Sequence, residues 1–144
     1  MPEENLNAYI HYFENLTPET LEDLSNVMAN NVRFKDPFND VKGIAHVMNV
    51  FQHMFETLDD PKFMIDDFAL SEQGMGLILW TMTFRLKGKS VHHEVQGTST
   101  VVFNEDGKVI EHIDYWDTSE QLYEPCIPIL GRLLKMIRRR LSAT

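Results

Sequence analysis

A histidine and an aspartate stand two residues apart in the last predicted strand of this chain. Val109–Asp117 is rich in β-branched and aromatic residues and follows a turn sequence, so we expect it to be extended. Side chains alternate across a strand, so one face carries Ile110, His112, Asp114 and Trp116. An imidazole and a carboxylate are costly to bury unless they are paired or used in function. The pattern therefore predicts a polar-lined pocket with acid/base capacity.

Two further ionisable residues could belong to the same pocket. Asp36 ends a predicted strand just before Pro37, where it could abstract a proton next to a carbonyl; the alternative is that it caps the following turn. His93, on a neighbouring strand, could complete an acid/base cluster with His112 and Asp114, or be an interior histidine bonded to backbone or water. The spacing of these three residues matches no compact metal motif, so we expect neither a metal nor a cofactor.

The elements that must position these groups follow from periodicity and turn residues. Apolar residues at helical spacing predict a first helix with its stripe at Leu6, Tyr9, Ile10 and Phe13. The other expected elements are a helix capped by Thr17 and ended by Asn30-Asn31, a strand Val32–Asp36, a helix from Gly43 to Asp59-Asp60-Pro61, strands Phe63–Leu70, Gly76–Leu86 and Ser90–Phe103, a capping box at Thr118–Gln121, and a last helix Ile129–Leu141.

This order predicts an α+β fold. Consecutive strands with short turns imply a mostly antiparallel sheet, and segregated helices imply that they lie together on one face of it. Three N-terminal helices across a curved sheet would enclose a conical cavity. Its expected wall is formed by Trp80, Met82, Phe84 and Trp116.

Length and composition limit the class of protein. A chain of 144 residues fits one domain, 1–144, in which residues 118–144 form a helical tail. Cys126 stands alone, and neither a secretory signal nor a membrane-length apolar run is present, so we expect a cytoplasmic protein. The net charge is −9, which argues against nucleic-acid binding.

The charge is unevenly distributed. The last thirteen residues hold five basic side chains and no acidic one, namely Arg132, Lys135, Arg138, Arg139 and Arg140. We expect this amphipathic helix to cover the cavity or a partner subunit, with its terminal arginines favourable to the helix dipole. Contact with anionic lipid is the alternative interpretation.

Nearly the whole chain resembles the ketosteroid isomerase and nuclear transport factor 2-like superfamily. The resemblance rests on Phe34–Gly43 after the second helix and on His112–Asp117 in the last strand. The tail from Leu122 to Pro125, followed by an Arg-rich helix, is similar to a SnoaL-like subgroup. The resemblance implies a cone-shaped fold and, from Ile113, Tyr115 and Val102 on the outer sheet face, a homodimer.

The resemblance also implies roles for single residues. Asp36 matches the general base of the steroid isomerases, and Tyr12, or else Tyr9, matches their oxyanion-donating tyrosine. Ser99 stands where those enzymes have a protonated carboxyl group. Asp114 matches the acid/base carboxylate of limonene epoxide hydrolases and of SnoaL cyclases, whereas Thr81 and Thr83 replace the other two members of the hydrolase triad.

We therefore predict cofactor-independent acid/base chemistry on an apolar, carbonyl-bearing molecule. The expected catalytic residues are Asp36, Asp114, Tyr12 and His112. The expected ligand-binding residues are Tyr9, Phe38, Trp80, Met82, Phe84, His93, Ser99 and Trp116. The alternative function is a non-catalytic module that binds an apolar metabolite or a partner protein.

Overall fold

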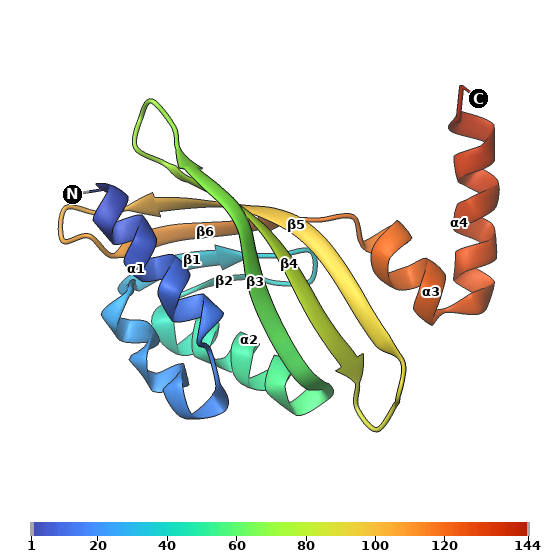
Figure 1. The fold of residues 1–144 in the computed structure, drawn as a ribbon, viewed down its shortest axis with the longest axis horizontal. Coiled ribbons are helices and arrows are strands. Elements are labelled where there is room, and N and C mark those ends of the chain that lie inside the picture. Colours follow the sequence, from blue (N-terminus) through green and yellow to red (C-terminus); the bar gives the residue numbers. More distant parts are fainter. Residues whose placement is uncertain (1, 144) are drawn as a thin grey trace.

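Six strands form one curved sheet in the computed structural model, which describes residues 2–143 (Figure 1). Their order across the sheet is β2-β1-β6-β5-β4-β3. The parallel pair is β1 with β6, and the other neighbours are antiparallel. The strands are β1 Met28–Lys35, β2 Asp40–Lys42, β3 Leu58–Leu70, β4 Gly76–Leu86, β5 His92–Phe103 and β6 Val109–Tyr115.

Three helices precede the long strands and pack on the sheet, as predicted. They are α1 Pro2–Glu14, the 3-10 helix η1 Pro18–Asn26 and α2 Ile44–Thr57. The predicted stripe of α1 is buried against β3 and the core. Thr17 caps η1, since its side chain accepts from the amide of Thr20 while the Thr20 hydroxyl accepts from the amide of Thr17.

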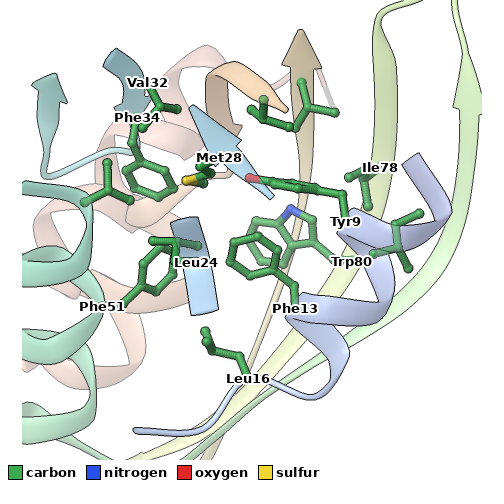
Figure 2. Close-up of a cluster of buried hydrophobic side chains, with 14 of the residues drawn as sticks. Tyr9, Phe13, Leu16, Leu24, Met28, Val32, Phe34, Phe51, Ile78 and Trp80 are labelled. Carbon is green, nitrogen blue, oxygen red and sulfur yellow. The ribbon is translucent and has the colours of Figure 1, made fainter. Parts of the chain in front are cut away.

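The apolar core lies between these helices and the inner face of the sheet. Figure 2 shows Tyr9 and Phe13 of α1 close to Trp80 of β4, with Phe34 and Phe51 on the other side of the same cluster. Each such side chain contributes about 1.5–3 kcal/mol by leaving water. The core therefore fixes α1 over the part of the sheet where β4, β5 and β6 run side by side.

Two predicted helix ends were wrong. Asn30 and Asn31 do not end a helix, because they lie inside β1, where the pairing with β6 shifts register. Asp59-Asp60-Pro61 does not end α2 either. These residues belong to β3, an edge strand whose register shifts between Asp59 and Lys62. A sheet tolerates proline in an edge strand or at a bulge, so Pro61 does not mark the end of an element here. The short strand β2 was not predicted.

The chain after the sheet forms a separate helical segment. It consists of η2 Ser119–Tyr123, α3 Glu124–Cys126 and α4 Pro128–Leu141. The capping residue of the predicted box was wrong. The side chain of Asp117, and not that of Thr118, accepts from the amides of Ser119 and Glu120. In Figure 1, α4 stands beyond the end of the sheet, on the opposite side of the molecule from α1, and it packs on η2 and α3. Within residues 2–143, none of the helices is both long and apolar enough to cross a membrane.

Candidate active site

Asp114 is the centre of a buried chain of hydrogen bonds. Its Oδ1 atom lies 2.7 Å from Nε2 of His112, and the hydroxyl of Ser99 donates to the same oxygen. On the far side of the imidazole, Nδ1 lies 2.6 Å from the hydroxyl of Tyr9. The indole N–H of Trp80 donates to Ser99 at 2.8 Å. Three strands and α1 thus bring five side chains into one continuous network.

Strand register explains why these residues meet. Ser99 of β5 lies opposite Asp114 of β6, and Val101 lies opposite His112. Ser99 and His112 therefore point to the same inner face, where both are buried. The predicted inward face of the last strand places His112 beside Asp114, as the structure shows.

The chemistry of the donors constrains the proton positions. An indole N–H can only donate, so Ser99 accepts from Trp80 and turns its own proton toward Asp114. The remaining pairing is complete when Nε2 of His112 donates to Asp114 and Nδ1 accepts from the Tyr9 hydroxyl. Every buried polar group of the network then has a partner.

Tyr9 is the buried end of the network. Its side chain is 1% exposed, and burial, followed by the negative charge of Asp114 and the proximity of Tyr12, raises its pKa well above the ordinary value. The phenol therefore stays protonated at neutral pH and acts as a fixed donor to His112. Its position holds one orientation of the imidazole ring.

Gly97 permits the close approach that completes the network. It lies opposite Trp80 in the β4–β5 pair. A Cβ atom at Gly97 would lie 2.6 Å from the Trp80 ring and 3.0 Å from Cβ of Trp116. The missing side chain therefore lets the indole lie across the sheet, with its N–H reaching Ser99.

Asp114 also lines a large cavity of about 420 Å³. The wall is mostly apolar, and its polar or ionisable members include Asp36, Asn39, His53 and Thr57. Of the predicted ligand-binding residues, this lining contains Phe38, Trp80, Met82, Phe84 and Trp116. A small cavity of about 40 Å³ adjoins the network and is lined by Tyr9, Ser99, His112 and Asp114 together with apolar side chains.

Only one of the two carboxylate oxygens of Asp114 is engaged. Both hydrogen bonds end on Oδ1, and among the described groups none bonds to Oδ2. The Asp114 side chain is 18% exposed, against 8% for His112. The carboxylate is therefore oriented through Oδ1 by its buried partners, while Asp114 itself is part of the cavity lining.

Asp36 lines the same cavity but is held in a different way. Its Oδ1 atom accepts from the amides of Phe38 at 2.8 Å and Asn39 at 2.7 Å, and from the Asn39 side chain at 3.0 Å. The side-chain amide of Asn39 also reaches Oδ2, at 3.1 Å. This is the turn-capping arrangement that the sequence allowed as the alternative to a general base.

Tyr12 and His93 lie outside the Asp114 network. The Tyr12 hydroxyl donates to the carbonyl of Thr20 at 2.9 Å and so ties α1 to η1. Burial, followed by the charge of Asp23, raises the pKa of Tyr12 to about 12. The His93 ring stacks on Phe84, with both ring nitrogens 3.9 Å from the sulfur of Cys126. Neither residue is in the lining of the two cavities.

Three polar residues of the cavity wall, Asn39, His53 and Thr57, were missed by the sequence prediction. Asn39 sits in the turn after Pro37, and His53 lies on α2. A signal for the α2 wall was present, because Val50, Met54 and Thr57 follow a second helical row beside the main apolar stripe. The hydrogen-bonding role of Trp80 was also missed, since only its apolar ring was considered. Within residues 2–143, no three His, Cys, Asp or Glu side chains are grouped to hold a metal.

The chain belongs to the SnoaL-like domain family, whose model matches residues 9–112. The matched segment begins at Tyr9 and ends at His112 inside β6, so it includes Tyr9, Trp80, Ser99 and His112 and stops two residues before Asp114. No curated protein sequence matches the chain.

Solved structures with the same fold are distant in sequence. An NTF2-like protein of unknown function from Exiguobacterium superposes with a TM-score of 0.68 at 21% identity, covering 78% of this chain and 98% of that one. A putative SnoaL-like polyketide cyclase from Jannaschia gives a TM-score of 0.70 at 13% identity, covering 84% of this chain and 90% of that one. An LEH-like epoxide hydrolase from M. tuberculosis gives a TM-score of 0.66 at 11% identity, covering 92% of this chain and 94% of that one. At these identities the likeness establishes the fold alone.

Proposed function

We propose that this SnoaL-like protein binds a small apolar carbonyl compound in the large cavity and transfers a proton on it, with Asp114 as the acid/base group. The observation that carries the proposal is the place of Asp114, which joins a fully paired buried network to the wall of the cavity. A carboxylate that is oriented through one oxygen and open at the other has the geometry of a general base.

The reaction begins with a proton on the carbon next to the carbonyl. Oδ2 of Asp114 takes this proton, the C–H bond breaks, and its electron pair moves to the carbonyl oxygen as an enolate. His53 and Trp116 carry N–H groups in the same lining and would donate to that oxygen. In a β,γ-unsaturated substrate, return of the proton from Asp114 to the γ-carbon shifts the C=C bond into conjugation and completes an isomerisation. In a dicarbonyl substrate, attack of the enolate carbon on the second carbonyl closes a ring, and the new alkoxide takes the proton from Asp114.

His112, Ser99 and Tyr9 act as positioning residues in this proposal. His112 and Ser99 fix the plane of the Asp114 carboxylate, and Tyr9 fixes the imidazole. Asp36, which the resemblance suggested as the base, is assigned instead to the turn that shapes one side of the cavity, because its carboxylate already accepts from Phe38 and Asn39. The proposal needs no cofactor.

Deuterium exchange tests the proposal without knowledge of the natural substrate. The protein is incubated in D₂O with apolar ketones of graded size, including the bicyclic ketone 2-decalone, and loss of the α-proton signals is followed by NMR. We expect exchange above the buffer rate for at least the bicyclic members, which suit an apolar wall. A complete absence of exchange across the series contradicts acid/base catalysis on ketones.

Non-catalytic binding is a second candidate, and one observation favours it. Ser99, the position of the second oxyanion donor in the resemblance, is already bonded to Trp80 and Asp114, so it lacks a free hydrogen for a ligand. This candidate predicts that an apolar molecule co-purifies with the protein and that ketones bind without exchanging. Native mass spectrometry of the freshly purified protein, followed by the same protein after solvent extraction, distinguishes bound from empty chains.

A homodimer through the outer sheet face remains part of the proposal. That face exposes Leu77, Leu79 and Tyr115, and Leu79, Thr98 and Tyr115 form one row across three strands. An apolar row on a sheet is the kind of surface that a second copy covers. Sedimentation equilibrium should give twice the chain mass, and Leu79→Asp should return it to one chain mass.

A further inference from the structure

The last helix exposes apolar side chains that the rest of the described chain does not cover. Ile129, Leu133, Met136 and Ile137 fall at i, i+4, i+7 and i+8 of α4 and so share one face. Ile129 is 84% exposed, and the other three are about half exposed. The helix packs on η2 and α3 through a different side, where Gly131 is buried.

Basic side chains surround this apolar face. Arg132, Lys135 and Arg139 follow i, i+3 and i+7 on the adjoining side of α4, and Arg140 lies within the apolar face itself. Lys135 and Arg139 line a shallow hollow at the C-terminal end of the helix. No acidic residue occurs in α4.

The rest of the chain has the opposite charge. All 22 acidic side chains lie outside α4, together with only eight of the 13 basic ones. The helix is therefore a concentrated basic and apolar surface on a strongly acidic protein. Figure 1 shows that α4 stands apart from the sheet, so a surface bound by this helix does not have to lie against the acidic sheet domain.

We propose that α4 docks the protein on an anionic lipid surface, with its apolar face in the boundary between head groups and acyl chains. Such a surface matches both the basic and the apolar side chains of α4, because the lipid phosphates bind the arginines while the aliphatic side chains enter the acyl region. It also accommodates Arg140, whose long side chain can bend back to the phosphates from within the apolar face. A protein groove that covered this face would have to bury Arg140 opposite a dedicated acidic residue.

Vesicle co-sedimentation of the full chain tests this proposal. The probes are vesicles of pure phosphatidylcholine and vesicles in which about one third of the lipid is phosphatidylglycerol. We expect the protein to pellet with the anionic vesicles at low salt, to be released by high salt, and to stay in solution with the neutral vesicles. Pelleting that is absent, or equal for both compositions, overturns the proposal.

Matched variants connect the binding to α4. Arg132→Gln with Arg139→Gln should weaken partition about 25-fold, at about fivefold per charge. Lys42→Gln with Lys89→Gln removes two exposed charges elsewhere and should change it little. Leu133→Gln with Ile137→Gln should also weaken partition, and the control for this pair is Met64→Gln with Val91→Gln, which alters exposed apolar residues of the body.

The controls also separate lipid from a second copy of the chain. If α4 instead binds the acidic body of another copy, Arg132→Gln with Arg139→Gln lowers the sedimentation coefficient in the absence of vesicles, and anionic vesicles do not pellet the protein. That result, or control variants that lose partition as strongly as the α4 variants, overturns the assignment of α4 to lipid.

Discussion

Two aspartates line the same cavity, and their hydrogen bonds differ. Asp36, after the first strand, accepts from two backbone amides and from the side chain of Asn39, all within three residues of the chain. Asp114, in the last strand, accepts from His112 and Ser99, and through them it is linked to Trp80 and Tyr9. The Asp36 carboxylate stabilises the turn that contains it, whereas the Asp114 carboxylate belongs to a network of side chains from three strands and α1.

The comparison shows that a cavity position does not by itself identify a base. The backbone amides of Phe38 and Asn39 and the side chain of Asn39 donate to Asp36, so the lone pairs of this carboxylate serve the turn. The partners of Asp114 both bind Oδ1, and among the described groups none bonds to Oδ2 of this residue, which lines the cavity. The predictions below test this difference, beginning with the largest expected effect.

Replacement of each aspartate by asparagine should affect proton exchange very unequally. Asp114→Asn removes the base, so exchange of ketone α-protons should fall by about 10²–10⁴-fold. Asp36→Asn keeps an oxygen that accepts from the turn amides, so exchange should stay within a few-fold of the unmodified protein. NMR exchange rates measured with both variants at one ketone concentration check this. Equal losses in the two variants contradict the assignment of separate roles.

Alanine substitutions at Asp36 and Asp114 should lower the free energy of unfolding by different amounts. Asp114→Ala leaves the Nε2–H of His112 and the hydroxyl of Ser99 buried without an acceptor, which should lower the free energy of unfolding by about 1–3 kcal/mol. Asp36→Ala removes the cap of an exposed turn and should cost about 1 kcal/mol. Urea unfolding curves give both values. A larger loss at Asp36 would show that the buried network contributes less than its geometry indicates.

Alkaline pH should distinguish the two tyrosines of α1. Both have a pKa raised by folding, Tyr12 to about 12, so the unfolded chain loses these protons first as pH rises above the ordinary value of 10.0. The contribution of the two raised pKa values to the free energy of unfolding is fully present below pH 10. It declines as the pH rises above 10, and for Tyr12 it declines up to the folded-state pKa of about 12.

Single phenylalanine variants isolate the two contributions. Tyr9→Phe should flatten the fall of the urea midpoint above pH 10 more than Tyr12→Phe, because Tyr9 is more deeply buried. The absorbance of tyrosinate in the folded protein gives an independent reading, in which Tyr9 is the last to ionise. Early ionisation of Tyr9 would show that its hydroxyl is open to water.

The sequence was sufficient to predict the main architecture. Helical and two-residue periodicities predicted α1, β4 and the inward face of β6, because each has a clean division between apolar and polar faces. The sequence-based element boundaries were wrong where proline or asparagine occurs inside a strand. Register shifts in β1 and β3 accommodate these residues, which would otherwise end an element.

The site was partly predictable for a related reason. His112 and Asp114 are neighbours on one strand, so alternation alone placed them together. The partners Ser99 and Tyr9 depend on the register of β5 with β6 and on the position of α1, which a single sequence does not specify. The sequence allows either role for Asp36, and the hydrogen bonds from Phe38 and Asn39 favour the turn.

The most direct test of the difference between the two aspartates is a crystal structure with 2-naphthol, an apolar bicyclic molecule with a single O–H donor. The account predicts that the ring system occupies the large cavity and that the hydroxyl donates to Oδ2 of Asp114, while Asp36 keeps its bonds to the amides of Phe38 and Asn39. A naphthol hydroxyl bound to an Asp36 that has released its turn, with Asp114 uncontacted, would contradict the account.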